Sequence, residues 1–258
     1  MIPRGRSVPY YVFQSLDSYP ELLHAVTTRR GGVSAGHFAS LNLGHAVGDS
    51  PEAVEENHRR LAEELGIPKD FFVSPRQVHG NHVAIVTKAS RGSVVPDTDA
   101  LITNHRMVPL LLRFADCTPI LVYDPRRHAI GLGHAGWRGT VARMAEALVR
   151  AMSEAFGSDP ADMIAAVGPA IGPCCYEVGP EVVSRVEQEL GPEFLSNRKA
   201  DGHAHFDLWA ANERQLRDSG VGKVEVAGVC TACHKDEFFS HRGDHGRTGR
   251  FGVVMMLR

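Results

Sequence analysis

The chain is divided into many short apolar runs of strand length, and this division constrains its fold more than any other feature. Glycine, proline or aspartate borders each run, and runs of four to eight residues with such borders are typical of β-strands. Seven runs predict strands, at residues 82–87, 108–114, 120–123, 129–133, 163–167, 224–229 and 251–257. The sequence Asp-Pro-Arg-Arg at residues 124–127, between two of these runs, predicts a hairpin turn.

Four segments predict helices. Ser50 caps the first, residues 51–65, and Gly66 stops it; the second covers residues 141–156, with Thr140 as the cap and Gly157 as the stop. The third covers residues 180–190, and the fourth begins after Asp207 and ends before residue 220. Strands outnumber helices and often follow one another directly, which favours the α+β class, with mixed β-sheets packed against helices. We expect the 258 residues to form a single domain.

Composition excludes several classes of partner. The 28 basic and 30 acidic side chains leave a net charge of −2, which gives no field for a nucleic-acid backbone or an anionic membrane. We find no apolar segment of the length of a membrane span and no secretory signal. The five cysteines are an odd number and too few for a disulfide scaffold. We therefore expect a cytoplasmic protein that binds neither nucleic acid nor membrane.

Three residues stand at the edges of apolar runs, beside glycine or proline, where loops present functional side chains: His79, Cys117 and His134. They are separated by 38 and 17 residues. This spacing defines no metal motif by itself, since structural zinc sites usually contain closely spaced pairs. A buried cysteine with two ordinary loop histidines remains the alternative.

A second candidate is Cys230-Thr-Ala-Cys233-His234, which has the spacing of a haem-attachment signature or of half a zinc site. Haem attachment implies an export route that the N-terminus does not indicate. A zinc site needs a second pair, and Cys174 and Cys175 are adjacent in sequence, which is poor geometry for chelating one ion. We therefore interpret these residues as cysteines in a loop at a strand end.

Arginine and glycine alternate near the C-terminus. Arg242, Arg247 and Arg250 could bind an anion such as phosphate through their forked guanidinium groups, and a solvated turn explains them equally well. The glycine patterns of phosphate-binding loops, of dinucleotide-binding folds and of serine-hydrolase elbows are absent from the sequence.

A series of motifs resembles the YfiH-like, laccase-domain family. In chain order they are TTRRGGVS, SLNLG, VEENHRRL, RQVHG, DTDALITN, ADCTPILVYDP, GHAGWRGT, GPAIGPCCYEVG, FDLWAANERQL and FFSHRGD with TGRFGVVMML. They cover nearly the whole chain, and GHAGWRGT with ADC upstream is highly specific. The resemblance implies an α+β fold with mixed sheets, related to cysteine-hydrolase-like deamidase folds.

The resemblance also implies an activity. Members of this family are purine nucleoside enzymes, which phosphorolyse adenosine, inosine and S-methyl-5′-thioadenosine and deaminate adenosine. The ligands and catalytic residues carried over are His79, Cys117 and His134, with zinc as the metal and copper as a possibility. Three protein ligands leave a fourth position open. An ion there could activate water for attack on C6 of adenine, or hold a phosphate oxygen for attack on C1′ of the ribose.

The same motifs suggest further contacts. Arg76, Asn42 and Arg138 are expected to bind the phosphate or the sugar. Asp116 either orients the neighbouring Cys117 or is a buried turn residue. The expected partners are a small purine nucleoside and phosphate, and the chain is expected to be a monomer. Cys233 lies outside the family pattern, as does His234.

Three other functions remain open. In a metal-free amidase that acts on peptidoglycan precursors, Cys117 would be the nucleophile and His79 or His134 the base. A copper polyphenol oxidase is less favoured, because four-electron reduction of oxygen needs more metal ligands than one three-ligand site provides. A non-catalytic nucleoside-binding module is disfavoured by the intact set of three ligands.

Overall fold

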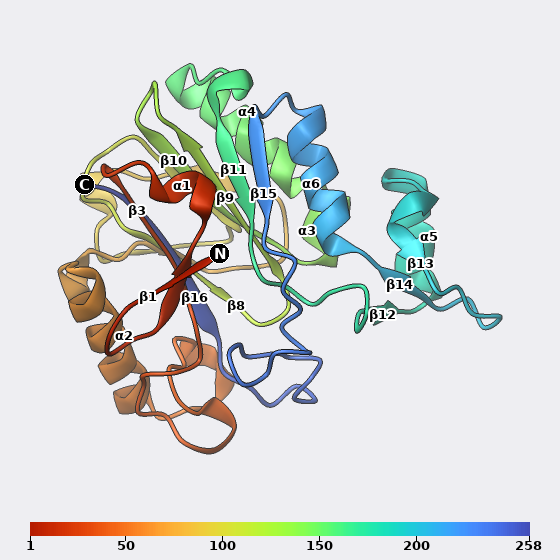
Figure 1. Cartoon of the computed structure of the whole chain (residues 1–258), viewed down its shortest axis with the longest axis horizontal. Helices are drawn as coiled ribbons and strands as arrows, with labels where there is room; N and C mark the ends of the chain where they lie inside the picture. The colour runs from red at the N-terminus through yellow and green to blue at the C-terminus, as the bar shows by residue number, and fades with distance from the viewer.

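Two β-sheets form the centre of the protein, whose computed structural model describes residues 1–258 (Figure 1). The first sheet is antiparallel throughout. Its order is β1 (Ile2–Arg4), β2 (Tyr10–Val12), β3 (Leu22–Thr27), β16 (Phe251–Leu257) and β8 (Leu110–Phe114). The C-terminal strand β16 therefore lies inside the sheet, between β3 and β8.

The second sheet is mixed. Its order is β15 (Lys223–Val226), β11 (Ile164–Val167), β9 (Thr118–Asp124), β10 (Ala129–Ala135), β7 (Ala100–Thr103) and β5 (Val83–Ile85). The outer pairs β15–β11 and β5–β7 are parallel, whereas the inner pairs are antiparallel. This arrangement confirms the expected α+β class with mixed sheets.

Strand β9 shows why the two sheets pack together. All seven of its residues are buried, and their side chains point alternately to the two faces of the sheet. Leu121 and Tyr123 belong to the apolar core that also contains Val253 and Leu257 of the first sheet. The other face packs against α4 (Met144–Phe156) and α6 (Leu208–Asp218).

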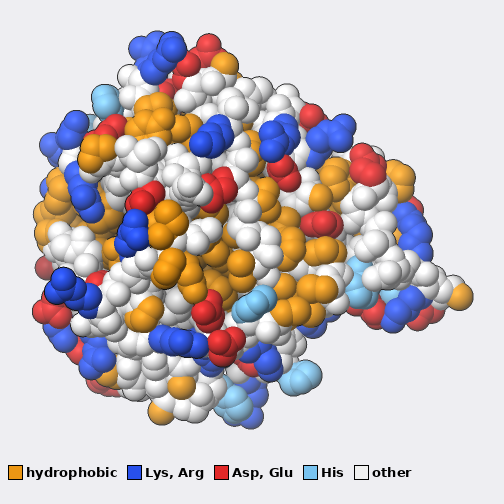
Figure 2. Space-filling model, in the orientation of Figure 1, with side chains coloured by type: hydrophobic (Ala, Val, Ile, Leu, Met, Phe, Trp, Pro, Cys, Tyr) orange, Lys and Arg blue, Asp and Glu red, His pale blue; other side chains and the backbone are white.

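Helix α2 (Pro51–Leu65) covers the outer face of the first sheet, where Leu61 and Leu65 pack with Leu111 and Val254. The main body is thus layered helix, sheet, sheet, helix, and Figure 1 shows α2 on the opposite side from α4 and α6. Acidic and basic side chains are interspersed on the face that Figure 2 shows. None of the helices is long and apolar enough to cross a membrane.

A smaller lobe projects to one side of this body (Figure 1). It consists of β12 (Glu177–Val178), β14 (Ala204–Phe206), β13 (Leu195–Ser196) and α5 (Pro180–Glu189). The remaining elements are short: α1 (Gln14–Asp17), α3 (Trp137–Val141), β4 (Ser74–Pro75), β6 (Val94–Val95) and the 3-10 turns η1 (Gly36–Phe38), η2 (His45–Val47), η3 (Lys69–Phe71), η4 (Lys88–Ser90), η5 (Pro160–Asp162) and η6 (Pro192–Phe194).

The structure confirms most of the expected helix ends. The hydroxyl of Ser50 accepts a hydrogen bond from the Ala53 N–H at the start of α2, and Gly66 ends that helix in the left-handed conformation. The carboxylate of Asp207 caps α6 in the same way. The hairpin at residues 124–127 is confirmed as well, because Asp124 Oδ1 accepts from the backbone N–H groups of the next two arginines.

The predicted helix from residue 141 to residue 156 is wrong at its start. The chain forms α3, passes through a left-handed residue at Arg143 (φ 61°) and begins α4 at Met144. Thr140 is not a cap, because its hydroxyl accepts from Asn212 and its carbonyl accepts from Gln215, both on α6. These contacts engage the carbonyl that a continuous helix would use.

Each of the seven predicted runs contains a strand, although the ends shift by up to three residues. The other nine strands were not predicted; most of them are two or three residues long, but β3 and β7 are longer, and β3 is the middle strand of the first sheet. In β3 a histidine, His24, interrupts the apolar run. That side chain is buried, and its Nε2 accepts a hydrogen bond from the Phe13 N–H at 2.8 Å.

His24 makes stability depend on pH. Burial lowers its pKa to about 4, and only a neutral ring can accept from Phe13. The unfolded chain takes up the proton near pH 6.5, so the stabilising contribution is lost as the pH falls from about 6.5 towards 4. The variant His24→Gln keeps a hydrogen-bond acceptor but cannot ionise in this pH range. We expect the free energy of unfolding to fall between pH 7 and pH 5 in both proteins, by about 1–2 kcal/mol less in His24→Gln than in the wild type. Urea titrations at pH 7 and pH 5 measure the free energy of unfolding of both proteins. An equal decrease in the two proteins would contradict the role assigned to His24.

Candidate metal centre

His79, Cys117 and His134 meet in space although they are distant in sequence. Each offers one potential ligand atom, and these atoms lie within 4.8 Å of one another. The register of the β9–β10 pair, in which Thr118 lies opposite Ala135, brings the start of β9 to the end of β10 and so Cys117 close to His134. The two imidazole rings are 5.0 Å apart and nearly perpendicular. The sequence-based grouping is therefore a real cluster.

The carboxylate of Asp99 holds both histidines in place. It is fully buried, and it accepts hydrogen bonds from the backbone N–H groups of residues 78, 79 and 80 at 3.2, 2.9 and 2.7 Å. These bonds bend the chain so that His79 takes the left-handed conformation, with φ 63°. Oδ1 of Asp99 also lies 2.9 Å from Nδ1 of His134. That carboxylate can only accept, so Nδ1 carries a proton, and Nε2 is the nitrogen that would bind a metal ion after losing its own proton.

The charges of the cluster favour a thiolate. Burial raises the pKa of Cys117, but its attraction to and hydrogen bonds with His134 and His79 outweigh burial and lower the pKa to about 6. Burial likewise lowers the pKa of His134, but the Cys117 thiolate and the Asp99 carboxylate raise it to about 9. A thiolate is the form of cysteine that binds metals or attacks carbon.

One side of the cluster is narrow and another is open. A methyl group at Gly136 would lie 2.9 Å from Sγ of Cys117 and 3.3 Å from the His79 ring, so only glycine fits there. His79 is exposed, whereas His134 is buried. A small ligand can therefore approach the cluster from the His79 side.

Asp116 acts as the centre of the turn before Cys117. Its φ of 87° is left-handed, and its carboxylate accepts from the hydroxyls of Thr231 and Ser240 and from the backbone N–H of Arg242. Its own carbonyl accepts from the Ile171 N–H at 2.9 Å. Asp116 thus positions Cys117 through the backbone.

The three other expected contact residues lie in different environments. Asn42 is fully buried. The NH₂ group of its side chain donates to the carbonyl of Gly44 and to the carboxylate of Asp49, and its oxygen accepts from the backbone N–H groups of Gly44 and Arg250. Arg76 is exposed and pairs with the exposed Asp97 at 2.9 Å. Arg138, four residues after His134 in the chain, is also exposed, and its guanidinium lies 4.4 Å from the Trp137 ring centroid.

The sequence did not predict that Asp99 or Arg250 interacts with residues of the cluster. Asp99 lies within the motif DTDALITN, but no spacing in the sequence connects it to His134. Arg250 was considered only as part of a possible anion-binding tail. Burial lowers the pKa of Arg250, and the negative charges of Cys117 and Asp116 oppose that shift, so this half-buried cation interacts favourably with both.

The fold and the cluster define an α+β protein with a two-histidine, one-cysteine site of the kind that binds a transition metal. The sequence matches the family described as multi-copper polyphenol oxidoreductase laccase over residues 23–258, and the chain belongs to that family.

Named relatives and solved structures agree with this assignment. The purine nucleoside phosphorylase YlmD of Geobacillus stearothermophilus is 43% identical over 236 residues, which are 87% of this chain and 86% of the relative. The purine nucleoside phosphorylase of Deinococcus radiodurans is 42% identical over 234 residues, covering 91% of this chain and 88% of the relative. The crystal structure of the Bacillus licheniformis hypothetical protein YfiH superposes with a TM-score of 0.92, at 32% identity, over 98% of this chain and 99% of that chain.

Replacing Asp99 tests how the site is held together. In Asp99→Asn, one of the two acceptor oxygens becomes an NH₂ group that faces either the backbone N–H groups or Nδ1 of His134. We expect the affinity of the cluster for zinc to fall by about 10–100-fold, as for other partners of metal-ligating histidines. Competition with a chromophoric chelator measures this affinity. The control Asp70→Asn, at an exposed carboxylate, should bind zinc as the wild type does, and an unchanged affinity in Asp99→Asn would contradict the role assigned to this carboxylate.

Proposed function

We propose that the protein is a metal-dependent purine nucleoside phosphorylase that acts on adenosine, inosine and S-methyl-5′-thioadenosine and that also deaminates adenosine. The observation that carries the proposal is the His79–Cys117–His134 cluster, whose ligand atoms all lie within 4.8 Å. The names of the relatives support the phosphorylase part of the proposal.

The donor set fits one transition-metal ion. Two imidazoles and a thiolate suit zinc, which is the metal we propose, and copper is the alternative. Asp99 keeps a proton of His134 on Nδ1, so that Nε2 is the nitrogen that would bind the ion, in place of its own proton. When bound, the ion would supply a Lewis acid for an oxygen of phosphate or of water.

The side chains around the cluster suit an anionic substrate. In phosphorolysis a phosphate oxygen forms a bond to C1′ of the ribose while the bond from C1′ to the purine nitrogen breaks. Arg138 and Arg76 are exposed guanidinium groups that we propose as phosphate contacts. Arg250 adds a half-buried positive charge that interacts with Cys117. The side-chain oxygen of Asn42 accepts a hydrogen bond from the Arg250 N–H. We therefore propose that Asn42 contributes to the binding of the sugar indirectly, by positioning Arg250.

A metal-free hydrolase is the second candidate, and a specific geometry favours it. Cys117, His134 and Asp99 form a chain of nucleophile, base and orienting carboxylate, which is the arrangement of cysteine hydrolases and amidases. Such an enzyme would act on an amide, for example in a peptidoglycan precursor, and would keep its activity after treatment with a chelator.

The setting of the proposed enzyme is the cytoplasm, where nucleosides and phosphate are available and the free cysteines stay reduced. We propose that it works as a monomer, the state that the family resemblance suggests.

Product analysis with adenosine tests the proposal. Zinc-loaded protein should release adenine only when phosphate is present, and inosine should form with or without phosphate. We expect Cys117→Ala to lower both activities by about 100-fold or more, since even the outer partners of metal ligands contribute 10–100-fold. The control Val78→Ala, at an exposed side chain next to His79, should keep full activity.

Two results would contradict the proposal. Full activity of Cys117→Ala would remove the cluster from the reaction. No turnover of nucleosides by the zinc-loaded protein, with amide hydrolysis that survives chelation, would favour the hydrolase instead.

A further inference from the structure

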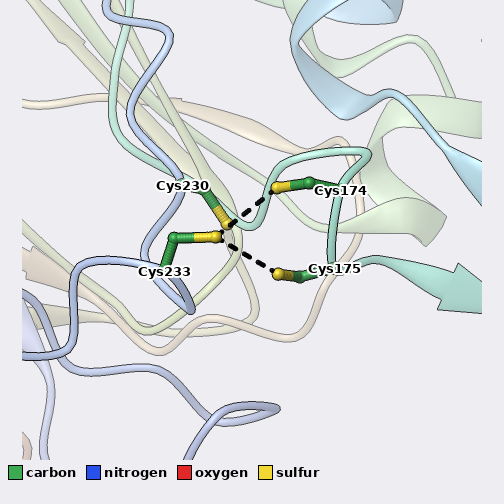
Figure 3. A group of neighbouring side chains, drawn as sticks. All are labelled: Cys174, Cys175, Cys230 and Cys233. Carbon is green, nitrogen blue, oxygen red and sulfur yellow. Dashed lines mark hydrogen bonds between the residues drawn. The ribbon is translucent and has the colours of Figure 1, made fainter.

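Four of the five cysteines gather at a second place, outside the cluster described above. Cys174 and Cys175 lie in the loop between β11 and β12, and Cys230 and Cys233 lie in the segment between β15 and β16. All four Sγ atoms lie within 4.8 Å of one another. Figure 3 shows the side chains of both pairs pointing into the space between the two segments. The cysteines do lie in loops that follow strands, as predicted, but the two pairs come together in space although Cys174 and Cys175 are adjacent in sequence.

We propose that Cys174, Cys175, Cys230 and Cys233 bind one tetrahedral metal ion, zinc, at a structural site separate from the His79–Cys117–His134 cluster. Four cysteine thiolates around one ion form a closed structural zinc site, without an open position for a substrate. The ion would link the loop after β11 to the segment after β15.

The distances suit a single ion. Two sulfurs bound to the same tetrahedral zinc lie about 3.8 Å apart, because each Zn–S bond is about 2.3 Å long. Sγ of Cys233 lies 3.6 Å from Sγ of Cys174 and 3.4 Å from Sγ of Cys175. A disulfide would require about 2.05 Å. An iron–sulfur cluster would hold its cysteines farther apart, since its own irons and sulfides occupy the centre.

The local backbone explains how two adjacent cysteines can serve one ion. The carbonyl of Gly172 accepts from the N–H groups of Cys175 and Tyr176, and this tight turn brings both cysteine side chains to the same side (Figure 3). On the other segment, the carbonyl of Cys230 accepts from the His234 N–H. The Gly172 N–H also donates to Sγ of Cys230 at 3.2 Å, a hydrogen bond of the kind that supports metal-bound thiolates.

The cysteine site would also support the other cluster. Thr231, next to Cys230, donates its hydroxyl to Asp116, and Ile171 donates its N–H to the Asp116 carbonyl. Both segments that carry the cysteines therefore contact the residue before Cys117. We expect loss of the ion to lower the melting temperature, while the hydrogen bonds of Asp116 keep the turn in place below that temperature.

Metal counting separates the two sites. Each protein is reconstituted with excess zinc under a phosphine reductant and then desalted. The wild type should hold about two zinc ions per chain, and each of the variants Cys117→Ser and Cys233→Ser should hold about one. The control Ala232→Ser, at the neighbouring position, should hold two. The Cys233→Ser protein should keep phosphate-dependent nucleoside cleavage at a temperature where it is folded. Zinc contents that do not change on replacing Cys233 would overturn the proposal, whether or not the proposed phosphorylase activity is found.

Alkylation gives a second measurement that needs no variant. Cys174 and Cys233 are exposed, so burial alone cannot protect them from iodoacetamide. In zinc-loaded wild type under the same reductant, mass spectrometry should find all four cysteines of the site unmodified, and a chelator should make the exposed pair reactive. Rapid alkylation before chelation would overturn the proposal. Cysteines that are protected without the reductant but react once it is added, with no chelator present, would indicate a disulfide, and this result would overturn the proposal as well.

Discussion

The fully buried carboxylate of Asp99 is the interaction on which the site depends most. A buried carboxylate is costly unless hydrogen bonds satisfy it, and Asp99 accepts three backbone N–H groups and the Nδ1 proton of His134. These bonds keep its pKa low although burial raises it. One side chain thereby joins the loop that carries His79 to the strand that carries His134. The resulting geometry leaves the two imidazoles facing the same thiolate.

The double-sheet body supplies the rigid frame for this arrangement. Cys117 precedes β9 and His134 lies in β10, and both strands lie inside the second sheet, buried on both faces. Asp116 positions Cys117 much as Asp99 positions the histidines. It accepts hydrogen bonds from hydroxyl and backbone N–H groups of the segments after β11 and β15. The four proposed zinc-binding cysteines lie on those same segments. The buried Asp116 thus connects the proposed catalytic and structural sites.

The sequence predicted those parts of the structure that depend on local chemistry. The cap at Ser50, the hairpin after Asp124 and strand β16 follow from residues that are near neighbours in the chain. The break before α4 was not predicted, because the contacts of Thr140 with side chains of α6 form only in the folded protein. The three ligands were found through a family resemblance, since their spacing is uninformative. The cysteine cluster was missed because its two pairs approach only in the folded protein, where a turn at Gly172 reorients the adjacent cysteines.

The central claim is that His79, Cys117 and His134 hold one metal ion together. An anomalous-difference map from a crystal of zinc-loaded protein, collected above and below the zinc edge, tests it most directly. We expect a zinc peak about 2.0–2.1 Å from a nitrogen of each histidine and about 2.3 Å from Sγ of Cys117. The absence of zinc density at this position, in crystals whose protein retains zinc, would contradict the account.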